Sequence, residues 1–432
     1  MHPIRVTIES LAHGGDGVSR LPDGRTVFVP YSCPGDEVAI TVTEEHGRWA
    51  RAQIHSIETP SPDRVTPPCP YFTACGGCNW QHIAYAAQTA AKRQTLVDAL
   101  TRIGGLTAPD VAETVASPTE YGYRNKIELT AGPDGGRTLG FLRARTNTVL
   151  AIDACPLLPK RAAKLPRSLS GALRFIASRG AEGIVRASVR MSSSGEIAVD
   201  VWTRPGPFPR AAAARVISEA VGARTVTRTI MRDIEKRDVS QVEVLSGSGA
   251  WHETVGGDRY AVSAPSFFQV NTAATVALRE HALDMLAPDG TMRVADLYAG
   301  AGTFTLPITR AAGEVVAVEA SRYALADLRE NLDGASLDAD VVPGDAAYAL
   351  KDLGHLDAAL IDPPRSGISD KAMQALESAR IPRIVYVSCD PATLARDVSR
   401  LSAAGYAARR FVPVDLFPQT YHLETIALLE LG

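Results

Sequence analysis

Near the C-terminal end of the chain, a cysteine stands where a buried strand would stop. Residues 384–387 form a short apolar run, and Cys389 follows it just before Asp390-Pro391. A thiolate is a soft nucleophile that can form covalent intermediates. A lone cysteine in an α/β core is more often a structural residue. Because this one lies where the strand ends and a proline turn begins, we favour a chemical role for Cys389.

A glycine-rich turn follows another apolar run, residues 294–297, and contains Gly300 and Gly302. The next strand ends in Glu319, nineteen residues after Gly300. Such a turn lets a nucleotide-like ligand approach the backbone, and the carboxylate can accept hydrogen bonds from ribose hydroxyls. A dinucleotide site would prefer a third glycine where Thr305 stands, and a plain strand-to-helix connection would explain the turn alone. Together the features favour a nucleotide-type cofactor.

Three more acids follow or precede apolar runs. Asp345 and Asp362 come after the third and fourth runs of the C-terminal part, and Glu424 comes directly before the last, residues 425–429. Each could be a solvated surface acid, and His422 could be a surface histidine. Positions at the ends of parallel strands favour the site for Asp345 and Asp362.

Four of the six cysteines have spacing that suits a metal centre. Cys69, Cys75 and Cys78 are spaced C-x5-C-x2-C, and Cys155 follows 77 residues after Cys78. Such clustering in a long chain suits a metal site better than disulfides. Four thiolates could hold a [4Fe–4S] cluster or zinc, although the five-residue gap is unusual for a zinc ribbon.

The elements that must position these residues fall into three modules. Alternating apolar runs separated by turns predict a small β-barrel over residues 1–60. Residues 61–260 begin with a linker and a helix at about 84–103, and strand-like runs then predict an α+β module. In residues 261–432, apolar strands alternate with helix-length stretches, which predicts a doubly wound, Rossmann-like α/β sheet covered on both faces.

Charge is unevenly distributed among these modules. Residues 61–260 carry 26 Lys and Arg against 18 Asp and Glu, whereas residues 261–432 carry 14 against 22. A basic middle suits a module that binds a polyanion, although ordinary variation between domains explains it equally well. No apolar run approaches the roughly 20 residues of a membrane span, and no signal peptide is evident. We expect a cytoplasmic monomer with no membrane partner.

Four motifs in the C-terminal module resemble the signature set of the RNA uracil-5-methyltransferase family, in the family's order. They are Ser266-Phe267-Phe268-Gln269-Val270-Asn271, Asp362-Pro363-Pro364-Arg365-Ser366-Gly367, Ser388-Cys389-Asp390-Pro391 and Phe417-Pro418 with His422-Leu423-Glu424. The resemblance implies that S-adenosylmethionine is the cofactor, that Cys389 is the nucleophile and that Glu424 is the base. It also implies, with the glycine turn, a cofactor and uracil site lined by Gln269, Tyr298, Gly300, Gly302, Thr303, Glu319, Asp345 and Asp362.

The implied chemistry explains why a cysteine is needed. C5 of uracil is a poor nucleophile, and addition of a soft thiolate at C6 converts the ring to an enolate with carbanion character at C5. A carboxylate then removes the C5 proton, and the thiolate leaves. The target uridine must be unstacked to reach these groups.

The rest of the chain is similar to one branch of the same family. The turns at Gly14–Val18 and Phe28–Asp36 resemble those of a TRAM domain, an RNA-associated barrel, and one branch of the family carries a [4Fe–4S] cluster at this cysteine spacing. We therefore favour a [4Fe–4S] cluster held by Cys69, Cys75, Cys78 and Cys155. Gly122-Tyr123-Arg124-Asn125-Lys126 also matches the family and suits an unpaired RNA segment.

That branch acts mainly on large-subunit ribosomal RNA, so the resemblance implies that 23S rRNA is the substrate. A tRNA uridine is the alternative within the same reaction. Two alternatives belong to other functional classes. The chain could be an RNA-binding protein with an inactive methyltransferase module, or a redox enzyme that uses the cluster. Retention of Cys389, Glu424 and the glycine turn argues against inactivity.

Overall fold

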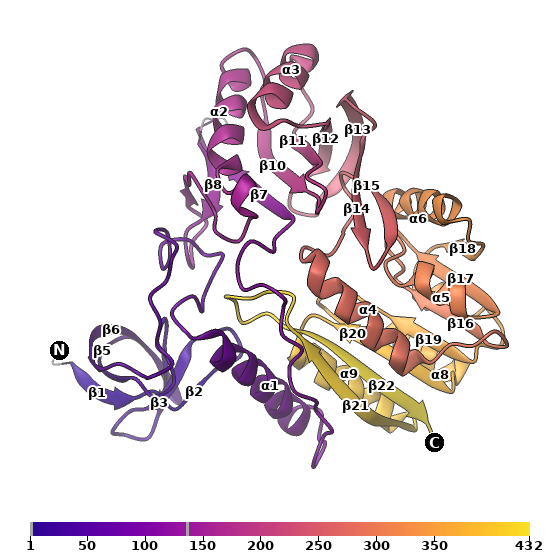
Figure 1. The fold of residues 1–432 in the computed structure, drawn as a ribbon. Coiled ribbons are helices and arrows are strands. Elements are labelled where there is room, and N and C mark those ends of the chain that lie inside the picture. Colours follow the sequence, from indigo (N-terminus) through magenta and orange to yellow (C-terminus); the bar gives the residue numbers. More distant parts are fainter. Residues whose placement is uncertain (1–2, 135–137) are drawn as a thin grey trace.

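A computed structural model of the chain describes residues 3–134 and 138–432 (Figure 1). The first module is a six-stranded sheet in the order β1-β5-β6-β4-β3-β2. Alternate residues of its strands are buried, such as Val27 and Val29, so the predicted alternation is confirmed. Its strands are β1 (Ile4–Thr7), β2 (Ser10–Leu11), β3 (Gly17–Arg20), β4 (Thr26–Val29), β5 (Glu37–Glu45) and β6 (Trp49–Thr59).

The middle module is a seven-stranded sheet in the order β13-β12-β11-β10-β7-β8-β9. Helices α2 and α3 pack their apolar faces on it, which agrees with the expected α+β class. The elements are β7 (Lys126–Ala131), β8 (Leu139–Leu142), β9 (Val149–Leu150), the short 3₁₀ helix η1 (Lys160–Ala162), α2 (Leu165–Ala177), β10 (Ile184–Met191), β11 (Ile197–Thr203), α3 (Arg210–Val221), β12 (Thr225–Asp233) and β13 (Asp238–Ser246).

The C-terminal sheet has the order β18-β17-β16-β19-β20-β22-β21, and all neighbouring strands are parallel except that β22 runs antiparallel to β20 and β21. Its strands are β16 (Arg293–Leu297), β17 (Glu314–Glu319), β18 (Asp340–Pro343), β19 (Ala358–Ile361), β20 (Arg383–Ser388), β21 (Tyr406–Val414) and β22 (Glu424–Leu431). Its helices are α4 (Thr272–Leu286), α5 (Thr305–Ala311), α6 (Arg322–Ala335), α7 (Ala346–Ala349), α8 (Asp370–Ala379) and α9 (Pro391–Ala403).

Both faces of this sheet are buried, as expected for continuous apolar strands. Along β20, Ile384 and Tyr386 belong to one core cluster, and Val385 and Val387 belong to another. Since successive side chains of a strand point to opposite faces, these two clusters cover the two sides of the sheet.

Two segments pack differently from the module boundaries drawn on the sequence. Helix α1 (Tyr85–Arg102) matches the predicted helix, but Leu96 and Leu100 are buried in the core of the C-terminal module. The hairpin of β14 (Ala250–Val255) and β15 (Asp258–Ser263) packs on α6, so a boundary at residue 260 falls inside β15. Each of these segments therefore packs on the core of the C-terminal module, although the boundaries drawn on the sequence place α1 and most of the hairpin in the middle module.

Among the helices in the described part of the chain, none combines the length and apolar character needed to cross a membrane.

Candidate active site

The candidate residues converge on one edge of the C-terminal sheet. Glu319, Asp362 and Cys389 lie at or just beyond the carboxyl ends of the parallel strands β17, β19 and β20. Glu424 begins β22, whose antiparallel direction brings its start to the same edge. Ser388 pairs with Thr425, so Cys389 and Glu424 lie one residue beyond that pair on adjacent strands. The turn and the hairpin together thus place a thiol beside a carboxyl group.

Burial controls the ionisation of the Cys389 thiol. It raises the pKa of Cys389 to about 12, and the nearby Glu424 and Asp362 carboxyl groups add to this effect. The Arg365 guanidinium acts in the opposite direction and favours the thiolate. In the free protein at neutral pH, Cys389 is therefore a thiol, and Arg365 is a side chain that can shift it toward the reactive form.

Burial also favours the neutral form of Glu424. Its side chain is only 4% exposed, and this burial raises its pKa well above the ordinary value, with Asp362 adding to the rise and Arg365 opposing it. Two adjacent groups that each lose a proton would place two negative charges together in a poorly solvated site. The site thus favours the protonated forms of both groups, and the reaction requires each of them to lose its proton.

The ionisation of Cys389 leads to a testable pH dependence. Because its pKa lies far above neutrality, the thiolate fraction should rise about tenfold per pH unit between about pH 7 and 9. We expect alkylation of Cys389 by iodoacetamide, followed by peptide mass spectrometry on the free protein, to rise with the same slope. Arg365→Gln should slow alkylation at every pH because it removes the charge that favours the thiolate. A plateau below pH 8 in the unaltered protein would contradict this assignment.

The glycine turn after β16 has the geometry of a ligand-binding loop. Gly300 and Gly302 have positive φ angles of 58° and 93°. A Cβ atom on Gly302 would lie 2.8 Å from Leu328 Cδ1, the end of a flexible side chain, so the positive φ angle favours glycine there more than packing does; the space beside Gly300 is open. Glu319 accepts hydrogen bonds from the backbone N–H groups of Gly300 (2.9 Å) and Ser321 (2.6 Å), which holds its carboxylate at the turn.

The remaining cofactor candidates surround this turn. Burial raises the pKa of Tyr298 to about 12, and Asp345 contributes to the rise. Asp345 also caps α7 by accepting the N–H of Ala347. The Thr303 carbonyl accepts a hydrogen bond from Tyr260, so this part of the turn is braced from the β15 side.

Two further acids lie on neighbouring strands of this edge: Asp296, which is buried in β16, and Asp362, which is half-buried just after β19. Asp296 accepts a hydrogen bond of 2.5 Å from the Thr305 hydroxyl. Thr305 is the residue that stands where a dinucleotide site would carry its third glycine. Burial raises the pKa of both Asp296 and Asp362 to about 7, and for Asp362 the neighbouring Asp296 adds to the effect. Acids with raised pKa values at the carboxyl edge of a parallel sheet are candidates for a functional site.

Gln269 supplies an unsatisfied polar atom. Its side chain is 4% exposed, and its Oε1 atom has no hydrogen-bond partner among the described residues. Its backbone carbonyl is fixed by Asn125 Nδ2 at 2.9 Å. A buried acceptor without a donor is costly unless a ligand supplies one. The open glycine turn and the Glu319 carboxylate fit a nucleoside-bearing cofactor, and Gln269 offers an acceptor that a ligand's donor could satisfy.

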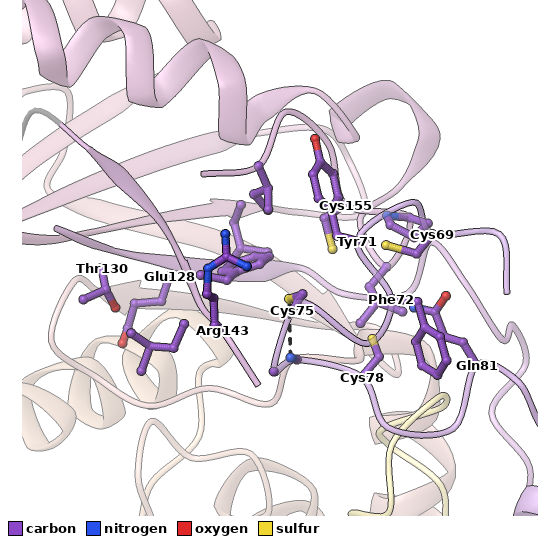
Figure 2. A pocket seen from close by; sticks show the side chains of 18 of the residues that line it. Cys69, Tyr71, Phe72, Cys75, Cys78, Gln81, Glu128, Thr130, Arg143 and Cys155 are labelled. Atoms are coloured by element: carbon purple, nitrogen blue, oxygen red, sulfur yellow. Dashed lines mark hydrogen bonds between the residues drawn. The ribbon is translucent and has the colours of Figure 1, made fainter. Parts of the chain in front are cut away.

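The four clustered cysteines line a single cavity of about 650 Å³ (Figure 2). Cys69, Cys75, Cys78 and Cys155 are free thiols, and Figure 2 shows their sulfur atoms facing one another around the same space. The Gly77 N–H donates to Cys75 Sγ at 3.4 Å. Within residues 3–134 and 138–432, no three His, Cys, Asp or Glu side chains are arranged to hold a single metal ion. A [4Fe–4S] cluster binds four cysteines through different irons and so needs a wider arrangement.

Three residues of the site had no role predicted from the sequence: Asp296, Arg365 and His13. Arg365 belongs to the Asp362–Gly367 motif, and Asp296 is the one charged residue in the run 294–297, which lies in β16, so both had a local signal in the sequence. His13 comes from the first module, and its Nε2 atom lies 3.2 Å from the Asp390 carboxylate. The His13 hydrogen bond lowers the pKa of Asp390, which caps α9 directly after Cys389. No local signal in the sequence indicates this contact.

Comparison with known families gives three matches along the chain. Residues 3–55 match the TRAM domain, residues 273–380 match the methyltransferase small domain, and residues 348–431 match tRNA (Uracil-5-)-methyltransferase. The last match contains the turn that carries Cys389 and the β21–β22 hairpin.

Full-length relatives agree with these matches. The chain is 33% identical to an uncharacterized RNA methyltransferase of Halalkalibacterium halodurans, over 99% of this chain and 97% of that protein. It is 34% identical, with the same coverage, to an uncharacterized RNA methyltransferase of Thermosynechococcus vestitus. The crystal structure of Pyrococcus abyssi tRNA (uracil-54, C5)-methyltransferase in complex with S-adenosyl-L-homocysteine superposes with a TM-score of 0.75, at 26% identity, over 99% of this chain and 100% of that one. The chain therefore belongs to the TRAM-containing family of S-adenosylmethionine-dependent RNA uracil-5-methyltransferases.

Proposed function

We propose that this enzyme methylates C5 of a uridine through a covalent bond between Cys389 Sγ and C6 of the base. The observation that carries the proposal is the placement of Cys389 and Glu424 on adjacent strands, one residue beyond a paired position. The two groups act on neighbouring carbons of one ring, so they must lie side by side.

Each chemical step uses a residue of this edge. The Cys389 thiolate adds to C6, and the electron pair of the C5–C6 double bond moves into an enolate whose carbanion character lies at C5. S-adenosylmethionine, when bound, supplies an electrophilic methyl group. Glu424, as a carboxylate, removes the proton from C5, the C5–C6 double bond re-forms, and the C6–S bond breaks. Arg365 favours the charged forms of both groups.

The residues proposed to hold the cofactor form the rest of the edge. Gly300 and Gly302 let the cofactor approach the backbone of the turn, and Tyr298 and Thr303 lie beside them. Glu319 can exchange its two backbone N–H donors for the ribose hydroxyls of the cofactor. Asp345, Asp362 and Gln269 offer polar atoms for the remaining groups of the cofactor and for the uracil edge.

We also propose that Cys69, Cys75, Cys78 and Cys155 hold a [4Fe–4S] cluster. Their shared cavity and the N–H donated to Cys75 support this, and zinc is the competing metal. We expect purified protein to show a broad absorbance near about 400 nm and to contain iron, and we expect Cys78→Ser to lose both. Cys33→Ser, at a free cysteine of the first module, is the matched control. Stoichiometric zinc without iron would contradict the assignment.

The proposed substrate is 23S ribosomal RNA, as the resemblance to the cluster-bearing branch implies. A tRNA uridine is the second candidate, because the Pyrococcus abyssi structure that superposes over the whole chain is that of a tRNA enzyme. Mapping of 5-methyluridine by mass spectrometry, in ribosomal and transfer RNA from a deletion strain and from the complemented strain, separates the two. Loss of the modified base from neither RNA would overturn the proposed function.

A further inference from the structure

The loop that leads into Glu424 is unusually well held. Residues 415–423 connect β21 to β22, and in Figure 1 this yellow loop extends from the sheet edge toward α1 and the chain near β7. Connections of this length at a sheet edge are commonly mobile. Here all nine residues are buried or half-buried, and Gln419 is held at a positive φ of 71°. The contacts that hold it come from outside the hairpin.

Four successive carbonyl groups of the loop each accept a hydrogen bond from another part of the chain. The donors are Asn271 Nδ2 to Leu416 (3.2 Å), Lys92 Nζ to Phe417 (3.1 Å), the Tyr123 hydroxyl to Pro418 (3.0 Å), and the backbone N–H groups of Asn79 and Trp80 to Gln419 (3.1 and 3.0 Å). Because Cys78 directly precedes Asn79, the cysteine segment is one of these supports.

Helix α1 adds two side-chain contacts. Gln88 Nε2 donates to Gln419 Oε1 at 3.0 Å, and Gln88 Oε1 accepts the N–H of Gln419 at 2.9 Å. Lys92 Nζ lies 2.7 Å from Asp415 Oδ1, and both side chains are fully buried. A buried ion pair contributes little net stability but specifies one arrangement, because breaking it leaves an uncompensated charge.

We propose that Gln88, Lys92 and Tyr123 are positioning residues for Glu424, and that this support serves removal of the C5 proton more than attack by Cys389. The inference rests on the proposed function. Cys389 lies on the separate turn between β20 and α9, so loosening the 415–423 loop displaces the base while the nucleophile keeps its place. A displacement of about 1 Å can slow a reaction about a hundredfold.

The affected step is defined by its bonds. In the methylated adduct, the C5–H bond breaks, the proton passes to the Glu424 carboxylate, its electron pair forms the C5–C6 double bond, and sulfur leaves C6 as the thiolate. If this step alone slows, covalent adduct accumulates and the rate becomes sensitive to deuterium at C5.

The test uses the full-length enzyme and a transcript containing the mapped uridine, made with ordinary or 5-deuterated uridine. Gln88→Met removes the paired amide contacts, and Tyr123→Phe removes only the hydroxyl that donates to Pro418. Gln94→Met, on the exposed side of α1, is the matched control. We expect Gln88→Met to lower turnover about tenfold, to raise the steady-state amount of covalent adduct on denaturing gels and to increase the deuterium isotope effect. The rate of adduct formation in a single turnover should change less than about threefold. Tyr123→Phe should change the same quantities in the same direction by less.

The results distinguish this inference from the function on which it rests. Lower turnover without more adduct or a larger isotope effect would overturn the inference, because general destabilisation reduces both steps equally. Unchanged turnover in both variants would also overturn it. Tyr123→Phe removes a single oxygen atom and carries the test should Gln88→Met fail to fold. If Glu424→Gln itself traps no adduct, the proposed function fails rather than the positioning role alone.

Discussion

Replacing Cys389 by alanine is expected to reduce methyl transfer to RNA by about 10⁴-fold or more, since removal of a covalent nucleophile usually costs at least this much. Without addition at C6, C5 of uracil lacks the carbanion character needed to accept a methyl group. The measurement is transfer of labelled methyl from S-adenosylmethionine to RNA under single-turnover conditions.

The control for this variant must exclude loss of folding or of cofactor binding. Cys33→Ala removes another free cysteine, which is fully buried in the first module and far from the catalytic turn in sequence. We expect it to keep near-normal activity, and we expect Cys389→Ala to bind S-adenosylmethionine with unchanged affinity. A folded, cofactor-binding Cys389→Ala protein that still methylates RNA at a near-normal rate would remove Cys389 from the mechanism.

Much of the catalytic edge could be predicted because its signals are local. The runs that become β17, β19 and β20 are short and continuously apolar, and that of β16 is interrupted only by Asp296, as expected for strands buried on both faces. Parallel strands bring their carboxyl ends to one edge, so the residues after each run must lie near one another. The glycine turn required no tertiary information either, since positive φ angles at Gly300 and Gly302 are local demands.

Features that depend on distant contacts could not be predicted in this way. Strand β21 contains the exposed pair Arg409-Arg410 and a register shift, so its pattern lacks the continuous apolar signal. The buried face of helix α1 carries Gln88 and Lys92 as well as Leu96 and Leu100, and nothing in its pattern tells which core this face covers. The contact between His13 and Asp390 joins residues 377 positions apart in the sequence. Each is determined by how the modules dock, which single-sequence periodicity does not contain.

Changing Glu424 to glutamine is expected to trap the enzyme on its RNA. Glutamine keeps the size and hydrogen-bonding shape of the side chain but cannot accept the C5 proton. Addition of Cys389 and methyl transfer can proceed, whereas expulsion of the thiolate requires that proton to leave. The adduct should appear as a slowly migrating band of protein and RNA on a denaturing gel, and it should disappear when Cys389 is also changed to alanine.

Folding of this variant should not be impaired, because burial already favours the neutral form of Glu424 in the folded protein. Its pKa is raised in the folded state by burial, so the native protein binds a proton more tightly than the unfolded chain does. The stability of the unaltered enzyme therefore falls as the pH rises above the ordinary glutamate range toward the folded-state pKa, and the amide lacks this dependence. Glu424→Gln should accordingly have a thermal midpoint equal to or above that of the parent at neutral pH, with a margin that grows as the pH rises through this window.

A matched control lies on the same strand. Glu430, at the other end of β22, is paired with Arg383 and Arg409 and lies away from the catalytic edge, so Glu430→Gln should turn over normally without trapped adduct. Comparison of the two variants separates a role in proton removal from a general effect of removing a carboxylate from β22. The assignment would be contradicted if Glu424→Gln released methylated RNA at the parental rate and gave no band that depends on Cys389. The base would then be another group, and Asp362 is the next candidate because it raises the pKa of both Cys389 and Glu424.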